Sequence, residues 1–368
     1  MHRIVIVGAG KIGAAIAKML DKSGDSNDNP SYQVTIVDTN MAALDKFRFD
    51  DSNITTSGLH IGSPEFVKLL SENDAVLSAC PYTANVQIAT AALEAGCSYF
   101  DLTEDRYTTE AIMDIAKAAK PGQAFMPQCG LAPGFIGILG NDVQRSLDND
   151  GNINLQMRVG ALPTNPNNRL GYNLTWSTVG LVNEYCNPCQ AVVNHSTVDV
   201  VGLEGLEDFI LDGVKYEAFN TSGGLGTLCE TLFDRVANVN YKTVRYPGHC
   251  ELMRFLLEDM GFHYNKHDLV KLLDNVIPTT GNDVVIAGAF ATGKRDGVLT
   301  SVDRMFKVPA QVMYDEWWTA IQVTTASGAC AVVDLCLNDK SWTGFIKQES
   351  VELSRFLSNR FGKNYLTK

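Results

Sequence analysis

The sequence has no run of apolar residues that approaches the 18 or more residues typical of a membrane-crossing helix. Basic residues are also few: 30 lysines and arginines stand against 42 aspartates and glutamates, which gives a net charge of −12, and no basic cluster is present. This balance argues against nucleic acid as a partner. The first predicted strand begins at Arg3, so we expect no secretory leader. We therefore expect a cytoplasmic protein that binds neither membranes nor nucleic acid.

A second closely spaced pair of cysteines is also missing. Cys186 and Cys189 in "YCNPCQ" have the C-x-x-C spacing, but a zinc site of this kind needs another such pair. The pair does not follow the strand of a thioredoxin-like unit either, so a redox motif is not favoured. We expect no metal site, and we interpret the nine cysteines as ordinary thiols of an intracellular protein.

The start of the sequence, "RIVIVGAGKIGAAIAKML" (residues 3–20), carries glycines at the G-x-G-x-x-G spacing. A short apolar and β-branched run precedes them, and apolar residues at helical spacing follow them, as a dinucleotide-binding fold requires. Gly8 would permit the tight turn, Gly10 would let a pyrophosphate approach the backbone, and Gly13 would let the helix pack on the strand. The alternative is an ordinary buried strand and turn.

A second predicted strand, "YQVTIVDTN" (residues 32–40), ends in Asp38. A carboxylate at this strand end accepts hydrogen bonds from a ribose 2′-hydroxyl and repels a 2′-phosphate, so NAD is favoured over NADP as the cofactor. Asp38 lies later than the usual spacing, and the polar segment "DKSGDSNDNP" (Asp21–Pro30) is interpreted as the lengthened loop that explains the delay.

Predicted strands and helices alternate up to about residue 131, which is typical of a doubly wound parallel sheet. Ligands of such sheets bind beyond the carboxyl ends of the strands, where the turn "CGLAPGF" (residues 129–135) would also lie. The residues predicted to bind the cofactor are Gly8, Ala9, Gly10, Lys11, Ile12, Gly13, Asp38, Cys80, Pro81, Leu102 and Thr103.

After "APG" the pattern changes to long stretches such as "NLQMRVGALP", "DVVIAGAFATG" and "EWWTAIQVTTA", which we interpret as strands of a largely antiparallel, one-sided sheet. The predicted fold class is α/β: a Rossmann-type doubly wound parallel sheet with a second α+β domain on a mainly antiparallel sheet. The predicted domains are 1–131 for the dinucleotide, 132–326 for the substrate, and a helical segment 327–368 that packs back on the first domain.

Five stretches, "GAGKIG", "GLAPGFIGIL", "VGALP", "EAFNTSGG" and "YKTVRYPGH", follow one another between residue 8 and about residue 250. Through them the protein resembles the saccharopine dehydrogenase family, most closely its lysine 6-dehydrogenase branch. The resemblance implies an NAD(P)-dependent amino acid dehydrogenase that oxidises a C–N bond in the side chain of its substrate. In lysine 6-dehydrogenase the imine hydrolyses to 2-aminoadipate semialdehyde, which cyclises to piperideine carboxylate. The segment between Asp148 and Arg158 does not match clearly.

The substrate amine has a pKa of about 10.4 and must lose its proton before a hydride departs, so a base is expected near the nicotinamide. His249 in "RYPGHCE" would titrate in a suitable range. Tyr172 in "LGYNLTW" and Glu104 or Asp105 are the other candidates. A hydrogen-bonded loop histidine and a packed tyrosine ring are the structural alternatives.

An α-carboxylate needs a guanidinium or a set of backbone donors. Arg245, in a loop with glycine and proline, is the preferred anchor, with Arg158 and Arg169 as alternatives, and a surface ion pair is the other interpretation of each. The segment "NTSGG" (residues 220–224) offers hydroxyls and N–H groups. The predicted catalytic residues are His249, Tyr172 and Arg245, and the predicted substrate-binding residues are Arg245, Thr221, Ser222, Gly223 and Arg169.

The number of cationic candidates bears on the substrate, because lysine carries one carboxylate and saccharopine carries three. Arg245 is the one arginine placed firmly at the site, with Arg169 and Lys242 as further candidates, so the count favours L-lysine. A saccharopine dehydrogenase, a non-catalytic NAD-binding protein, and a related imine reductase or polyamine-forming synthase are the alternatives. We expect a small amino acid as ligand and a homodimer or higher homo-oligomer.

Overall fold

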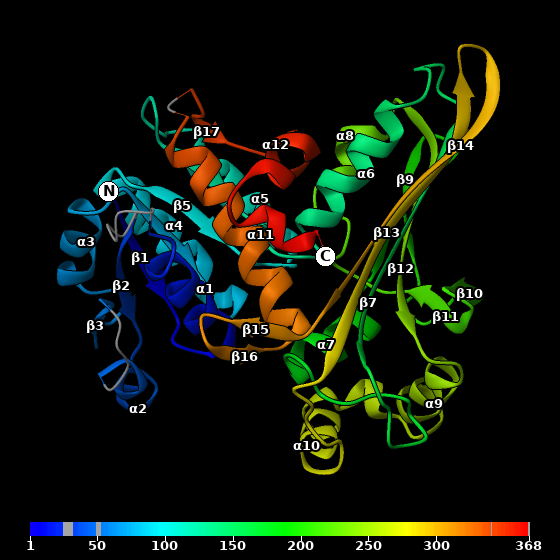
Figure 1. Cartoon of the computed structure of the whole chain (residues 1–368), viewed down its shortest axis with the longest axis horizontal. Coiled ribbons are helices and arrows are strands. Elements are labelled where there is room, and N and C mark those ends of the chain that lie inside the picture. Colours follow the sequence, from blue (N-terminus) through cyan, green and yellow to red (C-terminus); the bar gives the residue numbers. More distant parts are fainter. Residues whose placement is uncertain (25–31, 49–52, 340, 367–368) are drawn as a thin grey trace. The chain divides into compact units, whose positions relative to one another are not determined.

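The computed structural model describes residues 1–24, 32–48, 53–339 and 341–366 (Figure 1). Most of the predicted lengthened loop, from residue 25 to residue 30, lies outside these residues. The polypeptide divides into two compact units. Unit 1 contains Met1–Phe135 and Thr324–Asn364, and unit 2 contains Ile136–Val323 with the residues from Tyr365 onward.

Unit 1 is built on a seven-stranded sheet in the order β17-β6-β5-β4-β1-β2-β3, in which every pair is parallel (Figure 1). The prediction of a Rossmann-type sheet is confirmed. Its strands are β1 (His2–Val7), β2 (Tyr32–Val37), β3 (Thr55–Ser57), β4 (Ala75–Ser78), β5 (Ser98–Asp101), β6 (Ala124–Met126) and β17 (Gly344–Phe345). The strand order reverses beside β1, and ligands of open α/β sheets bind at such a point.

The helices of unit 1 follow from apolar residues at helical spacing and from caps made by polar side chains. Ser63 caps α3 by accepting from Phe66 N–H, and Asp105 caps α5 by accepting from Thr108 N–H. The helices are α1 (Lys11–Asp21), α2 (Met41–Leu44), α3 (Pro64–Ser71), α4 (Asn85–Ala95), α5 (Arg106–Ala116) and α12 (Leu353–Ser358), with most of α11 (Ala320–Leu337).

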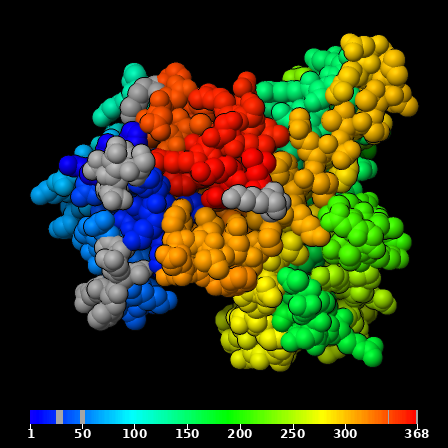
Figure 2. Space-filling model, in the orientation of Figure 1, coloured from blue at the N-terminus to red at the C-terminus, as the bar shows by residue number. Residues whose placement is uncertain are grey.

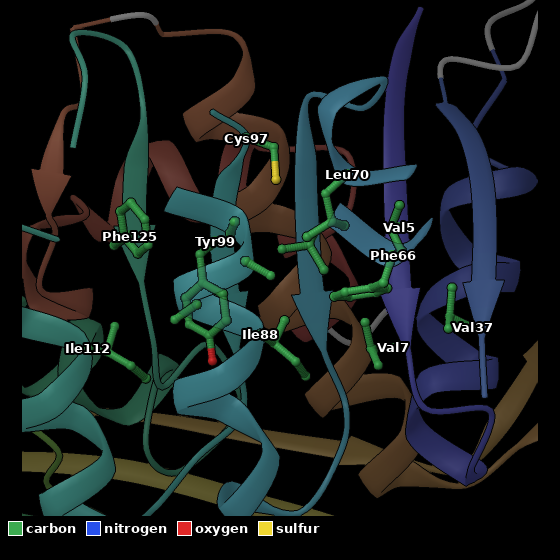
Figure 3. Packing of buried hydrophobic residues seen from close by; sticks show 14 of the residues in the cluster. Val5, Val7, Val37, Phe66, Leu70, Ile88, Cys97, Tyr99, Ile112 and Phe125 are labelled. Carbon is green, nitrogen blue, oxygen red and sulfur yellow. The ribbon is translucent and has the colours of Figure 1, made fainter. Parts of the chain in front are cut away.

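One hydrophobic core of unit 1 lies between the sheet and the helices α3, α4 and α5. Figure 3 shows Phe66, Ile88 and Ile112 of these helices close to strand residues such as Val5 and Tyr99. All five side chains are fully buried. Burial of such side chains is the main stabilising contribution to a fold of this kind.

The segment Thr324–Asn364 belongs to unit 1, and Figure 2 shows its C-terminal part, in red, at the surface. Its strand β17 pairs with β6, and Asp334 of α11 accepts a hydrogen bond from Tyr32 at 2.8 Å and pairs with Arg360. By length and composition alone α11 could cross a membrane, which corrects the expectation that no segment has this length, but 78% of that helix is buried inside the protein.

Unit 2 is built on an eight-stranded mixed sheet, with β10-β11-β12-β7-β13-β14 in order, β8 paired with β12, and β9 paired with β8 (Figure 1). Among the described strands of this second sheet only the β7–β12 pairing is parallel, so the predicted mainly antiparallel sheet is confirmed. The strands are β7 (Ile153–Pro163), β8 (Cys189–Val193), β9 (Ser196–Val200), β10 (Glu207–Leu211), β11 (Val214–Asn220), β12 (Val236–Arg245), β13 (Asp283–Arg295) and β14 (Val298–Pro309).

The stretch "EWWTAIQVTTA" is not one strand. Strand β16 covers only Glu316–Trp318, pairs with β15 (Gln311–Met313), and is followed by helix α11 from Ala320. The prediction was wrong because a short apolar run does not by itself distinguish a strand from a buried helix.

The helices assigned to unit 2 are α6 (Phe135–Arg145), α7 (Thr178–Cys186), α8 (Leu228–Leu232), α9 (His249–Arg254) and α10 (Lys266–Val276), although Phe135 itself falls in unit 1. The side chains of α7, α9 and α10 share a core that includes Leu181, Met253 and Leu269. This core also contains Tyr172 and Tyr185, so it brings polar groups near the carboxyl end of β12.

Candidate functional site

The turn between β1 and α1 has the backbone of a nucleotide site. Gly8 has a φ of +102°, and a Cβ at Gly13 would lie 1.9 Å from the Gly8 carbonyl oxygen. A Cβ at Gly10 would meet no described atom within 4 Å. Gly8 and Gly13 are therefore required by the turn and its packing, whereas Gly10 leaves room at the N-terminus of α1, where helix N–H groups favour a phosphate. The turn fits a dinucleotide.

Asp38 is bound to the same turn. Its carboxylate accepts hydrogen bonds from the N–H groups of Ala9, at 2.7 Å, and Asn40, at 2.8 Å. The Gly8 N–H donates to the Val37 carbonyl at 2.8 Å, which holds the end of β2 against the turn. An ionised carboxylate can accept about four hydrogen bonds, so Asp38 keeps capacity for ribose hydroxyls.

The other residues predicted to bind the cofactor lie at three places in unit 1. Lys11 and Ile12 begin α1. Cys80 lies beside the turn, because its sulfur is 3.2 Å from the position that a Cβ on Gly8 would take. Burial and the charge of Asp38 raise the pKa of Cys80 to about 11, so this thiol is neutral. Pro81 is exposed after β4.

Thr103, which follows β5 and the half-buried Leu102, belongs to a buried network around Asp101 that the sequence did not predict. The fully buried Asp101 carboxylate accepts from the Tyr99 hydroxyl at 2.7 Å and from the N–H groups of Thr103 and Gln128 at 2.9 Å each. Burial raises its pKa to about 6 against the effect of these hydrogen bonds. Asp101 thus ties together the loops that follow β5 and β6.

In unit 2, Arg245 at the end of β12 is 2% exposed. Its Nε donates to the Tyr185 hydroxyl at 3.1 Å, its Nη1 donates to the Val244 carbonyl at 2.9 Å, and its guanidinium lies 5.2 Å from the ring centre of Tyr172. Burial opposes the charge, yet Tyr185, Tyr172 and Glu184 together raise the pKa of Arg245 above its ordinary value. The arginine therefore stays charged.

His249 extends the same contacts. Its Nδ1 lies 2.9 Å from the Leu170 carbonyl oxygen, and its Nε2 lies 2.9 Å from the Tyr185 hydroxyl. Burial and the charge of Arg245 lower the pKa of His249 to about 3. The expectation that this histidine titrates near neutral pH is therefore wrong. We call Arg245, Tyr185, His249 and Tyr172 the Arg245 cluster.

The remaining substrate candidates are placed differently. Thr221 and Ser222 are buried after β11, where the Ser222 N–H donates to the Glu184 carbonyl on α7 at 2.9 Å, and Gly223 takes a φ of +85°. Burial raises the pKa of Tyr172. Arg169 is exposed, one residue before Leu170, and makes none of the contacts that define the Arg245 cluster.

The other cationic candidates of unit 2 are engaged elsewhere. Arg158 pairs with Glu207 at 2.6 Å and donates to Asn240, and Lys242 pairs with Glu207 at 2.5 Å. Arg158 and Lys242 therefore form ion pairs with a carboxylate of the protein itself.

The two acidic candidates lie in unit 1. The Asp105 carboxylate caps α5, while burial and Asp105 raise the pKa of Glu104.

Three residues of the site could not be found from sequence: Tyr185, Glu184 and Glu217. The Glu217 carboxylate accepts from the Gly248 N–H at 2.7 Å and from the Cys250 N–H at 2.6 Å, which fixes the start of α9. The nearest signal was the stretch "EAFNTSGG", which begins with Glu217. Nothing in its spacing points to α9.

Cys186 and Cys189 are both free thiols, and among the residues that the structure describes no three histidine, cysteine, aspartate or glutamate side chains are grouped to hold a metal ion. Burial raises the pKa of both thiols.

Comparison with known families agrees with this geometry. Residues 4–126 match the saccharopine dehydrogenase NADP binding domain, and residues 130–359 match the saccharopine dehydrogenase C-terminal domain. The protein belongs to the saccharopine dehydrogenase family. Unit 1 accordingly contains a pyridine nucleotide-binding domain, and the resemblance inferred from the five stretches is confirmed at the level of the family.

Individual relatives are distant. Saccharopine dehydrogenase [NADP(+), L-glutamate-forming] of Schizosaccharomyces pombe is 22% identical over 272 residues, which cover 71% of this sequence and 58% of that protein. The mitochondrial alpha-aminoadipic semialdehyde synthase of Rattus norvegicus is 23% identical over 54% of this sequence and 21% of its own length. The protein thus matches little more than half of the first relative and about a fifth of the second.

The solved structure of saccharopine dehydrogenase (L-Glu forming) from Saccharomyces cerevisiae has the same fold. It aligns with a TM-score of 0.73 at 14% identity, over 99% of this protein and 96% of that one.

Proposed function

We propose that the protein is an NAD-dependent amino acid dehydrogenase that oxidises the C–N bond at the end of the L-lysine side chain. The observation that carries the proposal is which cations of unit 2 form ion pairs with carboxylates of the protein. Arg245 is buried among aromatic rings and neutral hydrogen-bond partners, whereas Arg158 and Lys242 are paired with Glu207.

Of these three cations, Arg245 is the one not paired with Glu207, and a single cation of this kind favours a substrate with one carboxylate. Each carboxylate buried without a cationic partner costs several kcal/mol, so a ligand with three of them needs more than Arg245 alone. Glu184 lies within electrostatic range of Arg245 and Tyr172, so charges of both signs meet at the Arg245 cluster. A zwitterionic α-amino acid end therefore suits the Arg245 cluster.

The choice of NAD rests on Asp38. The residues that would hold the dinucleotide are Gly8, Gly10 and Gly13 at the pyrophosphate and Asp38 at the ribose hydroxyls, where its charge would repel a 2′-phosphate. The names of the family model and of the Schizosaccharomyces pombe relative carry NADP, so Asp38 is the residue on which this proposal departs from them.

When bound, the nicotinamide supplies the acceptor for the hydride that leaves the carbon bearing the ε-amine, and the imine then hydrolyses to the semialdehyde and ammonia. The side chains of the Arg245 cluster bind and orient the substrate and do not take up its proton. His249 is too weak a base to do so near neutral pH, and burial keeps the Tyr172 hydroxyl protonated. We therefore expect activity to rise with pH as the substrate amine, with a pKa of about 10.4, loses its proton.

Saccharopine is the second candidate substrate, and the name of the Schizosaccharomyces pombe relative favours it. It would require cationic partners besides Arg245. Of the two that the sequence suggested, Arg169 is exposed and Lys242 is paired with Glu207.

The decisive experiment incubates the protein with NAD or NADP and with L-lysine, saccharopine or L-ornithine, and follows reduced cofactor by its fluorescence. We expect NADH with L-lysine, a rate that increases from about pH 7 to about pH 10 as the amine deprotonates, and a weaker signal or none with saccharopine. A protein that ignores L-lysine and oxidises saccharopine contradicts the proposal in favour of the second candidate. Binding of NAD without turnover of any amine would instead identify a non-catalytic NAD-binding protein.

A further inference from the structure

Three hydrogen bonds connect the Leu170 carbonyl, His249, Tyr185 and Arg245, and the donor and acceptor of each can be assigned. We call this chain of hydrogen bonds the relay. A carbonyl oxygen only accepts, so the contact between His249 and Leu170 places the ring proton on Nδ1. The Nε2 of a neutral ring then accepts, which makes the Tyr185 hydroxyl its donor at 2.9 Å. That hydroxyl oxygen in turn accepts the Nε–H of Arg245 at 3.1 Å. Each of these three hydrogen bonds thus has one donor and one acceptor.

The relay is enclosed by the fold of unit 2. Arg245, Tyr185 and His249 are 2%, 3% and 1% exposed. The ring of Phe219 stacks on His249 with centres 6.2 Å apart, and the Tyr172 ring meets His249 edge-on at 5.4 Å. A group held in this way has few alternative rotamers, so its orientation costs little when a ligand binds.

The backbone around the relay is fixed as well. Glu217 accepts two N–H bonds at the start of α9, which positions His249, and Ser222 donates to Glu184 of α7, the residue before Tyr185. The two helices that supply Tyr185 and His249 are therefore each bound to β11 or to the loop that follows it.

We propose that Tyr185 is a positioning residue that orients the Arg245 guanidinium toward a substrate carboxylate, and that neutral His249 holds Tyr185 in place rather than acting as a base. The proposal rests on the proposed function for the identity of the substrate. It assigns the Arg245 cluster to recognition of the carboxylate end of the amino acid and separates it from the carbon that is oxidised.

Tyr185→Phe tests the proposal, because it removes the acceptor for Arg245 and the donor for His249 with little change in volume. We expect the KM for L-lysine to rise about tenfold, which corresponds to about 1.4 kcal/mol, while kcat changes less than about twofold. For 1,5-diaminopentane, which is lysine without its carboxylate, kcat/KM should be unchanged. A disturbance of the fold alone would lower kcat/KM for both amines.

Tyr246→Phe is the matched control. The Tyr246 hydroxyl donates to the Pro163 carbonyl at 3.0 Å and makes no contact in the relay described above. We expect both amines to be oxidised by Tyr246→Phe as by the wild type. Equal losses in Tyr185→Phe and Tyr246→Phe, or a loss for 1,5-diaminopentane as large as that for L-lysine, would overturn the role of Tyr185.

The role of His249 has its own tests. Nitrogen-15 NMR of the intact protein should show a neutral ring with its proton on Nδ1 from about pH 8 down to about pH 5, because its pKa is about 3. His249→Leu should raise the KM for L-lysine, and His249→Gln, whose amide can donate and accept in the same way, should recover most of that increase. A ring that titrates near its ordinary pKa of about 6.5, or no recovery in His249→Gln, contradicts the proposal.

Binding measurements separate this proposal from the proposed function. If no amine is oxidised, the dehydrogenase assignment fails, and calorimetric titration of NADH-loaded protein with L-lysine and with 1,5-diaminopentane still tests the cluster. Tighter binding of L-lysine that is lost in Tyr185→Phe supports the carboxylate role. Equal affinity for the two amines in the wild type overturns it.

Discussion

The candidate nucleotide site of unit 1 is made mainly of backbone, whereas the Arg245 cluster of unit 2 is made of side chains. In unit 1 the candidate site requires glycine at positions 8, 10 and 13 because these residues have no side chain. Asp38, at the end of the neighbouring strand β2, accepts a hydrogen bond from the Ala9 N–H of this turn. In unit 2 the hydrogen-bonded partners Tyr185 and His249 are 64 residues apart. In the glycine turn, an added side chain would strain Gly8 or Gly13 or occupy the space beside Gly10. The Arg245 cluster depends instead on every partner being present and oriented.

The two units also differ in the direction in which the pKa of a buried titratable group is shifted. Asp101 in unit 1 has a raised pKa of about 6 although it accepts hydrogen bonds from the Thr103 and Gln128 N–H groups. His249 in unit 2 has a lowered pKa of about 3 beside the charged Arg245. In both groups burial is the largest cause, and it favours the neutral form of each, so an acid and a base are shifted in opposite directions.

The largest effect is expected from Gly10→Val in the glycine turn. A branched side chain would occupy the open space that the pyrophosphate requires, so the dissociation constant for NAD should rise by about 100-fold or more, about 2.7 kcal/mol, while the thermal midpoint stays close to that of the wild type. Gly13→Ala should instead lower the thermal midpoint, because its Cβ meets the Gly8 carbonyl. Normal NAD binding by Gly10→Val would mean that the turn is purely structural.

Arg245→Ala should produce the next largest effect, in unit 2. Removing the buried guanidinium takes away the carboxylate partner, and truncation of a buried charged partner commonly costs about 2–5 kcal/mol, so we expect the KM for L-lysine to rise by about 100-fold. The affinity for NAD should be kept. Arg169→Ala, at an exposed arginine, serves as the control and should behave as the wild type. Unchanged kinetics in Arg245→Ala would remove the anchor from the proposal.

Asp38→Asn sharpens the cofactor assignment with a smaller effect. The wild type should bind NAD at least about tenfold more tightly than NADP, about 1.4 kcal/mol. The amide keeps an acceptor for the turn but loses the charge that repels a 2′-phosphate, so the preference should fall to near unity in titrations of nucleotide fluorescence. Equal affinities in the unmodified protein would refute the assignment of Asp38 to the ribose.

The smallest effects concern the pH dependence of stability. The pKa of His249 falls from 6.5 to about 3 on folding, so its contribution is complete above pH 6.5 and is lost as the pH falls toward 3. The pKa of Asp101 rises from 3.8 to about 6, so its contribution is complete below pH 3.8 and is lost as the pH rises through 6.

Thermal midpoints measured from about pH 4.5 to about pH 8 check both signs, because this range contains the upper part of both titration windows and the pH above them. Relative to the wild type, His249→Gln should lose less stability on acidification, and Asp101→Asn should lose less on the alkaline side, by at most about 1.4 kcal/mol per pH unit. Parallel curves for all three proteins would show that neither group changes its pKa on folding.

Some of the molecule could be predicted from local sequence patterns. The parallel sheet, the glycine turn and Asp38 follow from residues close together in sequence, because hydrophobic period and glycine spacing act over a few residues. The prediction for "EWWTAIQVTTA" failed for the opposite reason. Strand β16 ends at Trp318, and α11, which begins at Ala320, contacts residues far away in the sequence, such as Met19 and Tyr32.

The amino-acid sequence was enough to infer the family, the two kinds of sheet, and Arg245 as a candidate anchor. It took the folded structure to show that Arg158 and Lys242 are paired with Glu207, that Tyr185 contacts His249, and that His249 is neutral. A pKa and an ion pair depend on burial and on the nearest charges. Those neighbours are brought together by strand pairing and core packing, and the spacing of residues in the sequence holds no record of them.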